Sequence, residues 1–156
     1  MEINKNYWMN ELIHPLSPNE EDVKIYNDNL LKGSVLLLGC THKLINLSDC
    51  QMDIDPWYEG SNVIVQEWTT NRKSYTNIIG DGVLNFTKEA TDNLLLMCAN
   101  HSKIFVARSF NEKLPEMKIA NFFPTENDFN IKPKQTIKFD KYSFYIWNFI
   151  SWTQMF

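Results

Sequence analysis

The sequence is poor in cysteine and arginine and has no long apolar run, and each shortage excludes a class of protein. Its 156 residues include three cysteines, an odd number without Cys-x-x-Cys spacing, so we expect neither a disulfide framework nor a metal site. No apolar segment approaches the roughly 18 residues that a membrane-spanning helix needs, and the N-terminus lacks the apolar core of a signal peptide. We therefore expect a cytoplasmic protein without a membrane partner.

The charge of the chain bears on its expected partner, and its length on the number of domains. The formal net charge is −4 at pH 7, and arginine occurs only at Arg72 and Arg108. Without a basic run the chain has no electrostatic footprint for phosphate groups, so nucleic acid is not the expected partner. The length fits one domain. Its expected parts are an N-terminal segment and helix at 1–33, a core at 34–110, and a C-terminal loop and hairpin at 111–156.

The most informative stretch runs from Ser34 to His42 (SVLLLGCTH). Its apolar residues are continuous, which is typical of a strand buried on both faces at the centre of a parallel sheet. Gly39 follows directly, and a glycine at the carboxyl end of a strand lets a ligand approach the backbone because no Cβ intervenes. A buried strand that ends in glycine is more often ordinary core than a cofactor site, so this stretch does not establish a ligand site alone.

A second stretch of the same kind, residues 75–85 (YTNIIGDGVLN), strengthens the case. It is a short apolar strand followed by Gly-Asp-Gly at 80–82. Between the two stretches, Asp53 and Asp55 bracket an isoleucine. Ligands of open α/β sheets bind outside the carboxyl ends of the strands, and an acid near the end of the second strand typically binds ribose hydroxyls. The second stretch therefore favours a ligand site over an ordinary core.

These residues resemble two motifs of the class I S-adenosylmethionine (SAM)-dependent methyltransferases, most closely those of small, shortened members. Val35–Leu44 (VLLLGCTHKL) is similar to the first motif, and Ile78–Asn85 (IIGDGVLN) to the fourth. The resemblance covers about residues 7–110. Thr41 and Lys43 stand where the superfamily usually has the second and third glycines of Gly-x-Gly-x-Gly.

The resemblance implies that SAM is the cofactor and that it lies along the carboxyl ends of the strands. The residues expected to contact it are Gly39, Cys40, Thr41, Asp53, Asp55, Glu67, Trp68, Gly80, Asp81, Gly82, Asn85 and Trp8.

Four of these contacts have an expected role beside an alternative. Asp81 is the candidate catalytic base or orienting group, and cofactor binding alone is its alternative. Glu67 and Trp68 are expected to border the adenine, but a surface acid and a packed tryptophan explain them equally well. Trp8 belongs to an N-terminal segment that closes over the cofactor or simply anchors the chain end.

The sequence predicts an α/β fold, Rossmann-like, with a mostly parallel sheet, an antiparallel C-terminal strand and shortened crossover helices. Ser17, followed by Pro18 and Glu20, is the expected start of a first helix, and Thr87 that of another. The elements expected after the fifth strand are a loop at 110–135 with a short helix around 116–122, and a hairpin formed by 136–140 and 142–149.

The function that follows is methyl transfer to a small-molecule acceptor. The fourth strand lacks the Asp-Pro-Pro-Tyr-like motif of amino-methylating DNA enzymes and the Pro-Cys of cytosine-C5 enzymes. Two alternatives stay open: a non-catalytic SAM-binding subunit or regulatory partner, and a general nucleotide-binding domain. The aromatic stretch at 142–152 and the shortened helices favour a homodimer or a heteromeric partner.

Overall fold

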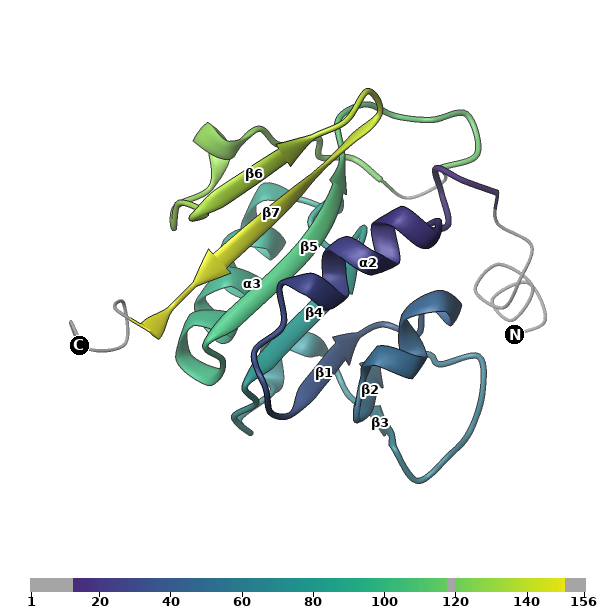
Figure 1. Cartoon of the computed structure of the whole chain (residues 1–156), viewed down its shortest axis with the longest axis vertical. Helices are drawn as coiled ribbons and strands as arrows, with labels where there is room; N and C mark the ends of the chain where they lie inside the picture. Colours follow the sequence, from purple (N-terminus) through teal and green to yellow (C-terminus); the bar gives the residue numbers. More distant parts are fainter. Residues whose placement is uncertain (1–12, 118–119, 151–156) are drawn as a thin grey trace.

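A computed structural model describes residues 13–117 and 120–150, and within them the chain forms one seven-stranded sheet with helices on both faces (Figure 1). The strands are β1 (Val35–Leu38), β2 (Cys50–Asp53), β3 (Val63–Val65), β4 (Asn77–Asp81), β5 (Ile104–Phe110), β6 (Gln135–Lys138) and β7 (Tyr142–Asn148). The helices are α2 (Glu20–Asp28) and α3 (Lys88–His101), with short 3-10 helices η1 (His42–Leu47), η2 (Trp68–Thr70) and η3 (Glu126–Asp128).

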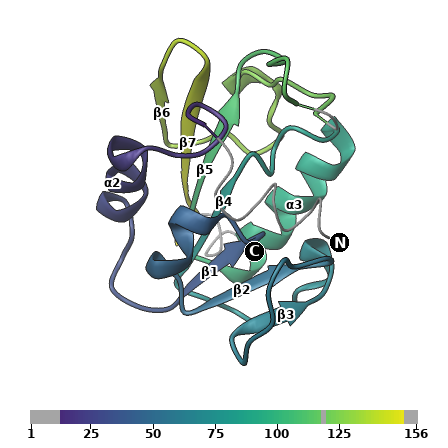
Figure 2. The ribbon, with the colours of Figure 1, turned by 90° about the vertical axis from the view of Figure 1, so that its right-hand side faces the viewer.

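The strand order is β3-β2-β1-β4-β5-β7-β6. Strands β1 to β5 are parallel to one another, whereas β7 is antiparallel to both β5 and β6. The β6–β7 hairpin therefore lies at the opposite end of the sheet from β2 and β3 (Figure 2). Strands β2 and β3 are added on one side of β1, and β4 and β5 on its other side. The point between β1 and β4 where the strand order reverses is a topological switch point, and open α/β sheets bind ligands there. The predicted Rossmann-like sheet is confirmed.

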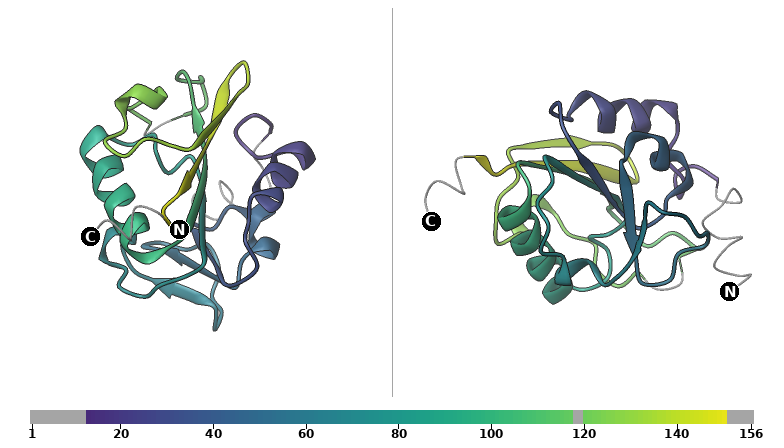
Figure 3. Two further views of the ribbon diagram at one scale, coloured as in Figure 1. Left: turned by 60° about the vertical axis from the view of Figure 1, so that its left-hand side comes forward. Right: turned by 90° about the horizontal axis from the view of Figure 1, so that it is seen from below.

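Alternate side chains of β1 serve two different cores. Leu36 and Leu38 belong to the core under α3, while Val35 and Leu37 belong to the core under α2 and η1. Figure 3 shows the sheet nearly edge-on, with α2 and α3 on opposite sides. The two-sided burial explains why the sequence of β1 is continuously apolar rather than alternating.

The start of α2 differs from the prediction. Its N-cap is Asn19, not Ser17, because the Asn19 side chain accepts from the Asp22 backbone N–H at 2.9 Å while the Asp22 carboxylate accepts from the Asn19 N–H at 3.0 Å. This reciprocal pair is a capping box, and it fixes Asp22 at the third helical position. The other predicted cap, Thr87, is confirmed by its side-chain bond to the Ala90 N–H at 3.0 Å.

The connections are short, as predicted. A 3-10 helix joins β1 to β2, and a loop joins β2 to β3, where doubly wound folds usually have longer helices. The short helix expected around 116–122 is wrong for the described residues there, which are turn and irregular; the chain instead forms η3 at 126–128, where Thr125 and Asp128 make a capping box.

The aromatic C-terminal strand is core. Six of the seven residues of β7 are buried, including Phe144, Tyr145 and Trp147. The antiparallel pairing of β6 with β7 confirms the predicted hairpin. The aromatic side chains of β7 are already covered by this chain. Trp152 lies outside the described residues.

Candidate functional site

The carboxyl ends of β1, β2 and β4 form the edge on which the site was predicted. Gly39 follows β1 with φ of +88°, a conformation that side chains rarely adopt. Its N–H donates to the Met52 carbonyl at 2.7 Å. A Cβ placed on Gly39 would meet only Trp68 Cζ2, at 3.8 Å, among the described residues. The end of β1 is therefore open to a ligand.

The residues after Gly39 turn their side chains into the protein. Cys40 is buried, and its carbonyl accepts from Trp57 Nε1 at 2.8 Å. Burial, helped by the neighbouring Asp53 carboxylate, raises the pKa of the Cys40 thiol to about 12. Thr41 is also buried and begins η1. A ligand at this turn would thus meet backbone rather than these side chains.

Asp53 ends β2 beside the turn. One carboxylate oxygen accepts from the Ile54 N–H at 3.0 Å. Burial raises the pKa of Asp53, and the nearby Asp55 carboxylate raises it further. The side chain of Asp55 is exposed. Asp53 therefore stands where the sequence predicted the ribose-binding acid, in a partly desolvated position that strengthens hydrogen bonds to a ligand.

Trp68 and Glu67 have different surroundings. Trp68 donates from Nε1 to the Met52 carbonyl at 2.7 Å and packs near Phe86, with ring centroids 6.1 Å apart. This places the indole at the side of Gly39, so it borders the predicted site. Glu67 is exposed and accepts from the Thr69 hydroxyl at 3.3 Å. Its predicted contact with adenine stays a prediction.

Asp81 ends β4, and a buried arginine binds it. Arg108 donates from Nε to one Asp81 oxygen at 2.7 Å and from Nη2 to the other at 2.9 Å. The Tyr26 hydroxyl also donates to Asp81, at 2.8 Å. The burial of Tyr26, together with this carboxylate, raises its pKa well above the usual value. Asp81 is thus engaged on both oxygens, which leaves it poorly placed to accept a proton from a substrate.

Arg108 joins Asp81 to a second carboxylate. Its Nη1 lies 3.3 Å from Asp22 Oδ2, and the side chains of Arg108 and Asp22 are 0% and 1% exposed. Burial alone would lower the pKa of Arg108, but the charge of Asp81 and its hydrogen bonds raise it overall. Asp22 also binds the Tyr142 hydroxyl at 2.8 Å and His14 Nε2 at 3.1 Å. We call Asp22, Asp81, Arg108, Tyr142 and His14 the buried network.

This network was not predicted from the sequence. Its one signal was an arginine inside the apolar strand at 104–110, where a buried charge requires a partner. The partners are contributed by segments far apart in the sequence, and no local pattern connects them.

The remaining predicted residues mostly shape the backbone. A Cβ on Gly80 would lie 2.8 Å from Val83, so this glycine permits close packing, and Gly82 turns the chain with φ of +73°. Asn85 is buried; its amide group accepts from the Phe110 N–H at 3.1 Å and donates to the Phe122 carbonyl at 2.9 Å. Asn85 therefore holds the end of β5. Trp8 lies outside the described residues.

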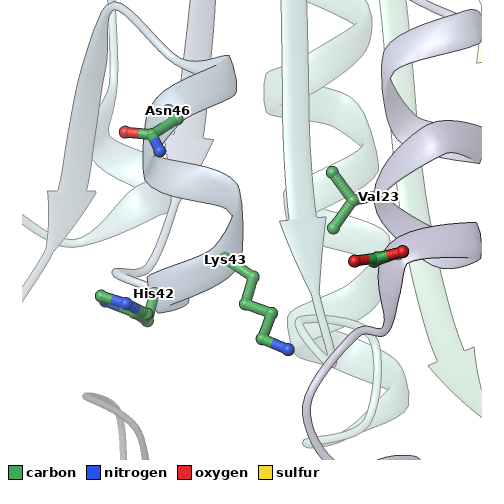
Figure 4. A pocket seen from close by; sticks show the side chains of 5 residues that line it. Val23, His42, Lys43 and Asn46 are labelled. Atoms are coloured by element: carbon green, nitrogen blue, oxygen red, sulfur yellow. The ribbon is translucent and has the colours of Figure 1, made fainter.

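A shallow hollow of about 370 Å³ lies on the same edge, between α2 and η1. Figure 4 shows Lys43 extending from η1 towards α2, with Val23 on the opposite wall. Its lining residues are Glu20, Val23, His42, Lys43 and Asn46. None of them was a predicted site residue.

In residues 13–117 and 120–150, no group of three or more histidine, cysteine, aspartate or glutamate side chains is arranged to hold a metal ion. Over the same part of the chain, no helix is long and apolar enough to cross a membrane.

Comparison with known proteins gave matches in structure only. No family model and no curated protein matches the sequence. The magnesium protoporphyrin IX methyltransferase of Synechocystis PCC 6803, solved with bound SAM, is 15% identical over 81% of this chain and 76% of that one, with a TM-score of 0.57. Its structure with bound SAH gives a TM-score of 0.50 at 15% identity, over 79% of this chain and 75% of that one. The CcbJ methyltransferase of Streptomyces caelestis gives 0.50 at 13% identity, over 70% of this chain but 56% of its own.

Proposed function

From the class I methyltransferase fold that this chain has, we propose that it binds SAM and transfers the methyl group to a small-molecule acceptor. The observation that carries the proposal is the open carboxyl end of β1 at Gly39, flanked by Asp53 and Trp68. The two Synechocystis structures of this fold hold SAM and SAH, which supports SAM as the cofactor.

The proposed contacts follow the geometry of the edge. The backbone at Gly39 to Thr41 would lie along the methionine and ribose, and Asp53 would accept hydrogen bonds from the ribose hydroxyls. Trp68 would form a wall beside the adenine. Asp81, fixed by Arg108, would orient the loop at 80–82 towards the methionine end rather than act as a base.

Methyl transfer from a sulfonium is an in-line displacement with a good leaving group. The protein contributes chiefly by holding the acceptor in line and by excluding water. A small acceptor is favoured over nucleic acid because the net charge is −4 and the sequence has no basic run.

Calorimetric titration of the purified chain with SAM and with SAH tests the proposal. We expect binding of both, and Asp53→Ala should weaken it by about 1–3 kcal/mol, the loss expected for a hydrogen bond to a charged group. Glu59→Ala, an exposed acid in the loop after β2, is the matched control and should bind as the wild type does. ATP and NAD serve as competing nucleotides. Failure to bind SAM and SAH would refute the proposal.

A second candidate is a SAM-binding subunit without transfer activity. The observation that favours it is the ion pair at Asp81, which removes the expected base. Tight binding of SAM without methyl transfer to any acceptor would support this candidate.

We also propose that the protein acts in the cytoplasm as a homodimer or with a partner subunit. Because the side chains of β7 are already buried, the contact would use other surface, and the exposed Ile54 and Val65 near the β3 edge are the strongest candidates. Light scattering at micromolar concentration tests this, and a clean monomer unaffected by added cell extract would contradict it.

A further inference from the structure

His14 is the one member of the buried network that reaches the surface. Its Nε2 lies 3.1 Å from Asp22 Oδ2 and 2.9 Å from the Tyr142 hydroxyl oxygen. The imidazole side chain is 39% exposed, whereas that of Asp22 is 1% exposed. The buried carboxylate of Asp22 and the hydroxyl of Tyr142 therefore fix the position of an imidazole that solvent can reach.

The hydrogen bonds assign the proton of a neutral imidazole to Nε2. A carboxylate only accepts hydrogen bonds, and the single hydroxyl proton of Tyr142 is donated to Asp22 Oδ1 at 2.8 Å. Both groups near Nε2 are thus acceptors towards it, so Nε2 carries the hydrogen. The lone pair is then on Nδ1, for which the described residues provide no hydrogen-bond partner. This arrangement orients Nδ1 as a proton acceptor.

The charges of the groups around His14 do not balance. Asp22 and Asp81 carry two negative charges, and Arg108 carries one positive charge. The groups that face His14 are Asp22 from α2 and Tyr142 from β7, with Arg108 of β5 behind them. A protonated His14 would therefore neutralise the remaining negative charge.

The strand pairing places His14 at the edge of the sheet where the methyl donor is proposed to bind. Tyr142 is paired with Phe110, the last residue of β5, and Arg108 is paired with Asp81, the last residue of β4. The imidazole thus lies at the carboxyl edge of the sheet, on the β5 side of the switch point. Ligands of this kind of sheet bind outside that edge.

We propose that His14 is the general base of the methyl transfer and that the acceptor carries a hydroxyl group; this rests on the proposed function. As the acceptor oxygen attacks, the new bond joins that oxygen to the methyl carbon, and the bond from the methyl carbon to sulfur breaks. The sulfur keeps the electron pair and becomes a neutral thioether. The hydroxyl proton moves to Nδ1 of His14, and Asp22 stabilises the imidazolium.

The competing explanation is that His14 only anchors the segment before α2. Transfer of radiolabelled methyl from SAM to two sets of small probes distinguishes the two roles. Phenol and catechol carry a hydroxyl that must lose its proton, whereas thiophenol and benzoate are already ionised near neutral pH and need no base. The variant is His14→Gln, and His101→Gln is the matched histidine control, because His101 ends α3 at the opposite edge of the sheet.

We expect His14→Gln to lower kcat for the hydroxyl probes about 100-fold or more, the scale of general base catalysis. The KM for SAM and any transfer to the ionised probes should stay unchanged. In the wild type, ¹⁵N spectra should show a neutral His14 protonated at Nε2.

Four results overturn the inference. These are an unchanged kcat for hydroxyl probes in His14→Gln, equal losses for both probe sets, a neutral His14 protonated at Nδ1, or a SAM-binding wild type that transfers methyl to no hydroxyl probe. A wild type that does not bind SAM refutes the proposed function itself, which calorimetry shows separately.

Discussion

Replacing Arg108 by methionine should destabilise the protein severely. The guanidinium donates two hydrogen bonds to Asp81 and one to Asp22, and another to the Leu16 carbonyl at 3.0 Å. The side chains of Arg108, Asp22 and Asp81 are 0%, 1% and 5% exposed. Methionine fills similar volume but leaves two carboxylates buried without a counter-charge.

The expected loss in the free energy of unfolding is about 3–5 kcal/mol, the usual cost of removing one partner of a buried ion pair. A domain of this kind has a total stability of about 5–15 kcal/mol, so the variant should be marginally folded. Adding Asp81→Asn to Arg108→Met should recover part of the loss, because it removes one of the unpaired charges.

Urea denaturation followed by tryptophan fluorescence measures these losses. Lys24→Met is the matched control, since it breaks the exposed pair with Asp28 at 2.6 Å, and it should cost less than about 0.5 kcal/mol. The Arg108 loss should be nearly the same at low and high NaCl concentration, because buried charges are weakly screened. A loss below about 1 kcal/mol, or one that high salt abolishes, would show that the network is solvated and that the reasoning is wrong.

Three further predictions concern the site. The SAM affinity of the wild type should fall on acidification, and the fall should begin at a higher pH than for an ordinary aspartate because burial raises the pKa of Asp53. Asp53→Asn should bind SAM weakly at every pH. Calorimetry at several pH values measures both affinities, and parallel pH profiles of wild type and variant would contradict the prediction. Gly39→Ala should cost about 1–2 kcal/mol of stability, since an alanine is strained at φ of +88°, and it should lower SAM affinity at least tenfold. The control is Gly33→Ala, whose Cβ would lie 2.2 Å from Thr76. It should destabilise the chain without changing SAM affinity per folded molecule. Asn85→Ala should cost about 1–3 kcal/mol in urea denaturation, because it leaves the buried Phe110 N–H without a partner, while a change confined to SAM affinity would instead support a direct cofactor contact.

The sequence predicted the sheet well because its signals are local. The continuous apolar run at 35–38 required burial on both faces, and the structure places it beside β4 with core on either side. The cap at Thr87 was also correct, since it depends on one side chain and the next turn. The N-cap of α2 was predicted wrongly because Ser17 and Asn19, two residues apart, both carry a side chain that can cap a helix.

The strand-end positions of the candidate site residues were predictable, but the contacts that some of them make were not. Gly39 and Asp53 lie at the expected strand ends because glycine and acid follow their strands directly. The role of Asp81 depends on Arg108, and that contact is set by the pairing of β4 with β5, which the sequence does not specify. The position of His14 depends in turn on Asp22 and Tyr142, and Tyr142 lies 128 residues away from it in the chain.

The late position of β7 in the chain, as an inner strand of the sheet, has a consequence for how the protein folds during synthesis. This strand lies between β5 and β6 and contributes Tyr145 and Trp147 to one core and Phe144 and Ile146 to the other. A ribosome-bound chain that has not yet released residues 142–148 therefore has two incomplete cores, and β5 is an exposed edge that can pair with other chains. Folding should be completed only after these residues emerge, and until then the exposed apolar surface and the unpaired edge of β5 favour aggregation.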